Sequence, residues 1–68
     1  MLIVIEIQTS ADGTVGNLVY SYDNLADAQA KFYSICAVAV KSSLPLHSVV
    51  LLTNDGTMVM SESFRHGD

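Results

Sequence analysis

The chain has little of what usually stabilises or identifies a small protein. Its 68 residues include one cysteine, one proline, no tryptophan and only three lysines and arginines. The single cysteine, Cys36, cannot form a disulfide within the chain, and a lone cysteine in an apolar run fits a reducing cytosol better than a secreted scaffold. A chain this short buries only about 60% of its unfolded surface, so its core is marginal. Without disulfides or a metal motif, self-association is the remaining route to extra stability.

The scarcity of basic residues argues against nucleic acid as a ligand. The net charge is −4, and proteins that bind DNA or RNA usually carry a basic patch, which this sequence lacks. The apolar runs are much shorter than the roughly 20 residues of a membrane span. The N-terminal segment "MLIVIEIQTS" has no basic region and its apolar run breaks at Glu6, so we interpret it as a strand rather than a signal peptide. We therefore expect no nucleic acid and no membrane as partner.

The first Asp-Gly pair, in "SADGTV" (10–15), indicates a β-hairpin. Asp-Gly is typical of a type I′ turn, whose two central residues both have positive φ. A two-residue loop of Asp12 and Gly13 places apolar and aromatic residues together on a predicted core face. The pairs on that face are Ala11–Thr14, Ile7–Leu18, Ile5–Tyr20 and Ile3–Tyr22.

The second Asp-Gly pair, in "TNDGTM" (53–58), predicts a second hairpin with a loop of Asp55 and Gly56. The predicted pairs on one face are Thr53–Met58, Leu51–Met60, Val49–Glu62 and His47–Phe64, and those on the other are Leu52–Val59, Val50–Ser61 and Ser48–Ser63. Neither face is clearly polar. We therefore expect both faces to be at least partly covered.

The segment between the hairpins, residues 23–43, has the pattern of a helix. It opens with two good N-cap residues, Asp23 and Asn24, and Asp27 falls in the first turn, where the helix dipole favours negative charge. Leu44-Pro45 ends it. Its apolar residues recur at helical spacing as one stripe, which comprises Leu25, Ala28, Phe32, Ile35, Cys36 and Ala39.

These elements predict one α+β domain over residues 1–68, with the order ββαββ. The two hairpins form one four-stranded antiparallel sheet, and the helix packs on one face of it. The run "SICAVAV" (34–40) is apolar nearly all round, although a surface helix usually shows polar residues on its outer side. We therefore expect a second copy of the chain to cover what the sheet does not. The predicted interface residues are Tyr33, Ala37, Val38 and Val40; the alternative is a monomer that tolerates them on its surface.

Candidate catalytic groups are few. Of the carboxylates, only Glu6 and Glu62 lack an obvious turn, cap or tail role, and we interpret both as solvated strand charges rather than an acid/base pair. Cys36 has no cationic neighbour to lower its pKa, so we interpret it as a core residue. No serine lies in a nucleophile-elbow motif, and no metal or phosphate-loop motif occurs. The sequence therefore predicts a protein that is not an enzyme and needs no cofactor.

An anionic ligand would need donors and cations, which this sequence supplies at few positions. We expect His47 and His66 to lie near one another, close to Phe64 and Arg65, at one end of the sheet. Tyr33 is the aromatic residue expected on the surface. The predicted ligand-binding residues are His47, Arg65, His66, Lys41 and Tyr33.

The sequence as a whole resembles short open reading frames of phages and prophages of gut Firmicutes. The resemblance covers nearly the full chain and is strongest in "MLIVIEIQT.ADGTV", in the Asp-Asn-Leu-Ala-x-Ala start of the helix and in "LP.H..VLLT..G". It implies a phage setting, in which small compact proteins commonly sit in the virion or block host defences. It implies no catalytic residues.

These observations leave two main functional hypotheses. One is a non-enzymatic, homo-oligomeric counter-defence protein of the host cytoplasm, which sequesters a small signalling nucleotide or occludes a host defence protein. The alternative is an accessory protein of the capsid or tail, located in the virion. A small hydrolase is the third and weakest hypothesis, because no nucleophile and base can be paired from the sequence.

Overall fold

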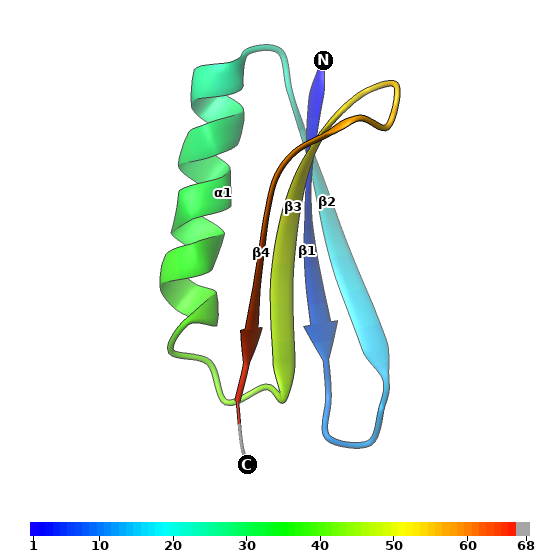
Figure 1. Cartoon of the computed structure of the whole chain (residues 1–68), viewed down its shortest axis with the longest axis vertical. Coiled ribbons are helices and arrows are strands. Elements are labelled where there is room, and N and C mark those ends of the chain that lie inside the picture. Colours follow the sequence, from blue (N-terminus) through cyan, green and yellow to red (C-terminus); the bar gives the residue numbers. More distant parts are fainter. Residues whose placement is uncertain (67–68) are drawn as a thin grey trace.

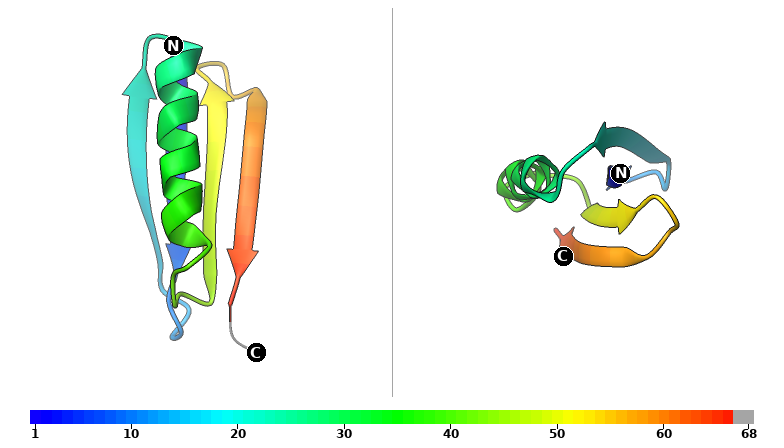
Figure 2. Two further views of the ribbon diagram at one scale, coloured as in Figure 1. Left: turned by 90° about the vertical axis from the view of Figure 1, so that its left-hand side faces the viewer. Right: turned by 90° about the horizontal axis from the view of Figure 1, so that it is seen from above.

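The computed structural model describes residues 1–66, which form four strands and one helix (Figure 1). Strands β1 (Leu2–Thr9) and β2 (Val15–Tyr22) precede helix α1 (Leu25–Ala39), and β3 (Leu46–Thr53) and β4 (Met58–Arg65) follow it. The strands form one antiparallel sheet in the order β2-β1-β3-β4. Figure 2 shows α1 on one face of this sheet. The predicted ββαββ fold is confirmed.

Helix α1 begins where the sequence predicts, because Asn24 caps it. The Asn24 side-chain oxygen accepts a hydrogen bond of 2.9 Å from the backbone N–H of Asp27, and its amide nitrogen donates one of 2.9 Å to the Asp27 carboxylate. This reciprocal pair satisfies one of the N–H groups that the first turn leaves without a partner. The helix ends at Ala39, with Val40 as C-cap, before the end of the predicted segment.

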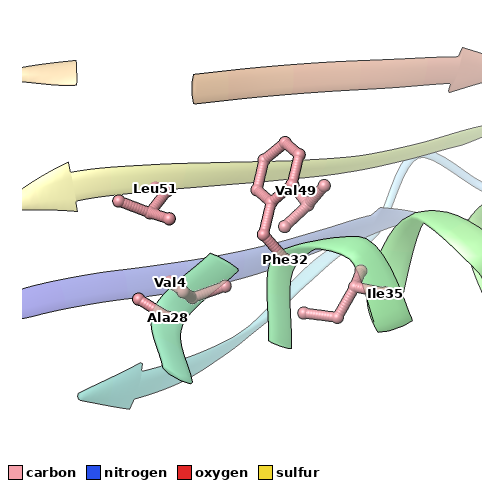
Figure 3. Packing of buried hydrophobic residues seen from close by; sticks show 6 residues of the cluster. All are labelled: Val4, Ala28, Phe32, Ile35, Val49 and Leu51. Carbon is pink, nitrogen blue, oxygen red and sulfur yellow. The ribbon is translucent and has the colours of Figure 1, made fainter. Parts of the chain in front are cut away.

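The core lies between α1 and the two central strands, β1 and β3 (Figure 3). Phe32 is 1% exposed and points from the helix toward the sheet, beside Val49. The buried cluster consists of Val4, Ala28, Phe32, Ile35, Val49 and Leu51. Four of the six predicted stripe residues of the helix are buried, whereas Cys36 is half-buried and Leu25 is exposed.

Both hairpin loops contain three residues, so the predicted two-residue type I′ turns are wrong. Gly13 and Gly56 have φ values of +88° and +89°, and no non-glycine residue among those described has a positive φ. A type I′ turn requires a positive φ at the aspartate too. Each loop is closed by a bond across its base: Ser10 N–H donates to Thr14 C=O, and Thr53 N–H to Thr57 C=O, both at 2.9 Å.

The extra loop residue shifts the first hairpin by one position. Leu2 pairs with Tyr22 and Val4 with Tyr20, whereas the sequence pattern predicts that these tyrosines pair with Ile3 and Ile5. Because alternate strand residues point to opposite faces, this shift moves every side chain of β1 to the other face. The predicted core face of β1 is therefore wrong: Leu2, Val4 and Glu6 face the helix.

The second hairpin keeps its predicted register away from the turn. Leu51 pairs with Met60, as predicted, but Leu52 pairs with Met58, so Val59 is the extra residue of a β-bulge. The bulge offsets the extra loop residue. Beyond the bulge all the predicted pairs are present, namely Val50–Ser61, Val49–Glu62, Ser48–Ser63 and His47–Phe64.

The side of the sheet away from α1, which we call the open face, is apolar at its centre. Ile3, Ile5 and Ile7 of β1 lie on it, together with the residues of β2 and β3 that pair with them. Its apolar members, which are half-buried on the central strands and exposed on the edge strands, are Ile3, Ile5, Ile7, Val15, Val19, Leu46, Val50, Leu52 and Met58. No element of residues 1–66 packs against this face (Figure 2).

Replacement of Gly13 by alanine tests the loop geometry. A left-handed backbone destabilises a residue with a Cβ by about 1–2 kcal/mol. No atom lies within 4 Å of the position that a Cβ would take, so backbone strain alone sets the loss. We expect urea denaturation to show a loss of about 1 kcal/mol for Gly13→Ala. Gly16→Ala is the control, because Gly16 has no positive φ and equal space around it; equal losses in the two variants would contradict this account.

Candidate functional site

A groove runs between α1 and the edge strand β4. It exists because α1 packs mainly on β1, β2 and β3 and covers little of the helix-side face of β4 beyond Met60, as Figure 2 shows. Its volume is about 430 Å³, and its lining residues are Phe32, Tyr33, Cys36, Met60, Ser61, Glu62 and Phe64. Apolar concave surfaces with a few polar groups are typical binding sites. We refer to it as the groove.

The walls of the groove are aromatic and apolar, and its charge is negative. Phe32 and Tyr33 meet edge to face, with ring centroids 5.5 Å apart, and Tyr33 is 58% exposed. Glu62 is the only charged residue among those that line the groove. Burial and the nearby Glu62 carboxylate both raise the pKa of the Cys36 thiol. A thiol held in its neutral form is a poor nucleophile, so Cys36 contributes an apolar surface.

A second polar feature lies beneath the loop that joins α1 to β3. His47 is 2% exposed, and its Nε2 donates a hydrogen bond of 2.6 Å to Glu6 Oε2. Its Nδ1 lies 3.0 Å from Ser42 Oγ, a hydroxyl that can either donate or accept a hydrogen bond. Gln8 Nε2 donates to the same Glu6 oxygen at 3.0 Å. This network joins β1, β3 and the loop.

The network sets the ionisation of Glu6. Burial favours the neutral acid, but the hydrogen bonds from His47 and Gln8, together with the charges of His47 and Lys31, outweigh it and hold the pKa of Glu6 below its ordinary value. Glu6 is only 8% exposed. Its interpretation as a solvated strand charge is therefore wrong, because the shifted register turns it toward the helix. Glu62 is exposed, as predicted.

Ser42, His47 and Glu6 are the residue types of a serine-hydrolase triad, but their placement favours a structural role. In such a triad the histidine must deliver its nitrogen to a hydroxyl that faces substrate. Here the histidine is buried, and Ser42 is not among the residues that line the groove. The network instead fixes the α1–β3 loop to the centre of the sheet.

His47 and His66 lie at one end of the sheet, near Phe64 and Arg65, as predicted, but of the five predicted ligand-binding residues only Tyr33 lines the groove. Tyr33 lines the groove, whereas Lys41 and Arg65 are exposed at the end of the molecule where α1 and β4 finish (Figure 1). His66 lies at this end too. Its Nε2 donates a hydrogen bond to the Ala39 carbonyl at 2.8 Å, and its backbone N–H donates one to the Pro45 carbonyl at 2.9 Å. Both ring nitrogens of His47 are engaged within the protein.

The predicted interface residues are all on the surface. Tyr33, Val38 and Val40 are 58%, 62% and 50% exposed, and Ala37 is exposed as well. They are spread around the C-terminal half of α1, and of the four only Tyr33 lines the groove. The larger apolar surface is the open face, which the sequence pattern wrongly assigns to the core because it pairs the isoleucines of β1 with tyrosines.

Within residues 1–66, no helix is long and apolar enough to cross a membrane. The same residues contain no group of three or more histidine, cysteine or acidic side chains arranged to hold a metal ion. Comparison with known proteins gives no assignment either. No family model, curated protein or solved structure matches this chain.

Proposed function

We propose that the chain is a non-enzymatic, phage-type binding protein that assembles with copies of itself and occludes a host defence protein in the host cytoplasm. The groove between α1 and β4 is the observation that carries this proposal. It is lined by exposed aromatic and apolar side chains, and it lies beside an edge strand whose backbone can accept a further strand. An apolar segment of a partner polypeptide fits such a surface.

The charge of the groove favours a polypeptide over a nucleotide. A phosphate needs cationic or N–H donors, but the charged lining residue is Glu62. Lys31 lies over the Tyr20 ring, 4.1 Å from its centroid, and Lys41 and Arg65 are not lining residues. A partner segment with apolar residues and one lysine or arginine opposite Glu62 matches this pattern.

The test uses a host that carries the matching defence system and a phage that the system restricts. We expect expression of the native chain to restore phage plating and expression of Glu62→Lys to lose at least about tenfold of that effect, because the new charge repels the basic segment. Asp23→Lys makes the same change of charge at an exposed site outside the groove and should behave as the native chain.

Calorimetry with a panel of cyclic nucleotides separates the two modes of counter-defence. We expect no heat from the native chain with any of them. If the native chain bound one of these nucleotides, and Glu62→Lys bound it more tightly, the result would contradict occlusion of a protein and favour sequestration of the nucleotide.

The virion accessory remains the second candidate, and the two uncovered sheet edges favour it. Strands β2 and β4 both present unpaired backbone groups, on which neighbouring subunits of a lattice can add. Mass spectrometry of purified particles decides between the two candidates, since a counter-defence protein of the cytoplasm should be absent from them.

A further inference from the structure

We propose that a second copy of this chain covers the open face, so that two sheets pack face to face in a homodimer. The inference rests on the self-association in the proposed function and assigns its surface. The sequence pattern places that surface on α1 instead, at Tyr33, Ala37, Val38 and Val40. The open face is the larger candidate, because apolar side chains from all four strands meet on it.

The composition of the open face is that of a sheet interior. An antiparallel sheet with one solvated face shows polar residues on that face. Here the central strand β1 places Ile3, Ile5 and Ile7 in a row, and β3 places Val50 and Leu52 beside them. The uncharged polar members of the open face are Thr9, Asn17, Ser21, Ser48, Ser61 and Ser63, and of these only Thr9 and Ser48 lie on the central strands. Such a surface is typical of the inner layer of a β-sandwich.

The distribution of charge allows two copies to meet there. The chain carries a net charge of −4, so most pairs of surfaces from two copies would repel one another. Among residues 1–66, however, every acidic residue lies off the open face: Glu6 and Glu62 point to the helix side, and the aspartates lie in the loops or at the start of α1. Arg65, at a corner of the sheet, is the charged member of the open face within those residues.

The area of the open face suits a dimer. Strands of eight residues, at about 3.4 Å per residue and about 4.8 Å between strands, give a four-stranded face a footprint of about 500 Å². Two such faces in contact remove about 1,000 Å² from water, which is about the smallest area expected of a biological interface. Face-to-face sheets also leave both helices, and therefore both grooves, on the outside of the dimer.

Sedimentation of the native chain and of two lysine variants tests the proposal. We expect a dimer for the native chain and at least about a 100-fold weaker association for Ile5→Lys, because the interface would bury an unpaired charge at its centre. Val38→Lys puts the same charge on the outer side of α1, where Val38 is 62% exposed, and should leave the dimer intact. Circular dichroism shows whether each variant is folded.

The absence of tryptophan provides a second measurement that needs no added charge. Val19 is on the open face and 59% exposed in the single chain. We expect the emission of Val19→Trp to move to longer wavelength as dilution separates the dimer, and that of Val38→Trp to stay constant. If Ile5→Lys does not fold, this measurement decides the question.

The outcomes separate the surface from the function. A native chain that sediments as a single copy at high micromolar concentration overturns both the self-association and its assigned face. A dimer that Val38→Lys breaks and Ile5→Lys does not, or one in which the emission of Val19→Trp is independent of dilution, overturns the open face alone. Self-association would then stand, with the helix as the interface.

Discussion

Replacement of Phe32 by alanine should lower the free energy of unfolding by about 3–5 kcal/mol. Phe32 is 1% exposed and is the largest member of the buried cluster, with its ring beside Val49. Removal of the ring leaves a cavity that a single helix on a single sheet layer cannot fill. A chain of this length is expected to have a total stability of only about 3–10 kcal/mol, so much of the variant should be unfolded at 25 °C.

Urea denaturation followed by circular dichroism measures this loss, with Val38→Ala as the control on the outer side of the same helix. Val38 is 62% exposed, so its truncation should change stability by less than about 0.5 kcal/mol. A loss of under about 1 kcal/mol for Phe32→Ala would show that the cluster around this ring is not the main core of the domain.

The second large effect is expected at Glu6. Glu6→Ala leaves the Nε2 donor of His47 and the amide of Gln8 without their shared acceptor in a buried site. Removal of one partner of a buried pair typically lowers stability by about 3–5 kcal/mol, and we expect about 3 kcal/mol here because Gln8 can turn toward water. Glu62→Ala, on an exposed site two strands away, should cost less than about 0.5 kcal/mol.

The Glu6 carboxylate also makes the free energy of unfolding depend on pH. The pKa of Glu6 is lower in the folded chain than its ordinary value of 4.5, so the folded state binds its proton less readily than the unfolded state does. This contribution is fully present above the ordinary value and is lost as pH falls below it through the folded pKa. Glu6→Gln should flatten the fall in stability below pH 4.5.

Other carboxylates titrate in the same range, so the comparison of variants matters. Hydrogen bonds from Thr14 N–H to Asp12, and from the Thr53 hydroxyl and Thr57 N–H to Asp55, lower the pKa of both aspartates. These groups are exposed loop residues that remain in every variant. The difference between Glu6→Gln and the native chain therefore isolates Glu6, and parallel pH profiles for the two would contradict the network described here.

The helix and the order of elements could be predicted because their signals are local. The cap at Asn24 and the stripe that contains Phe32 depend on residues within a few positions of one another. The register of the first hairpin could not be predicted, because Asp-Gly is compatible with loops of two or three residues; in the observed loop of residues 11–13 only Gly13 has a positive φ. In the second hairpin the bulge at Val59 restored the predicted pairs.

That one-residue error also hid two features of the structure. The shifted register exchanges Ile5 for Glu6 on the helix side, and so creates both the buried network and the open face. A signal existed in the sequence, because the second hairpin places His47 on the helix side, where a polar ring needs a partner. The observed register of β1 puts Glu6 on that same side, where its carboxylate and the His47 ring form a hydrogen bond.

The central position of β1 has a consequence for how the chain is made. The N-terminal strand is the first to be synthesised, yet one of its two neighbours, β3, follows only after the helix. His47 lies 41 residues after Glu6, so at about 5–20 residues per second a ribosome needs about 2–8 s between them. During that interval Glu6 lies on the nascent first hairpin without its hydrogen-bond partner, because His47 has not yet been synthesised. The sheet therefore cannot be completed before β3 is made, and any truncated product that stops before β3 should be recognised as unfolded by the cell's proteases.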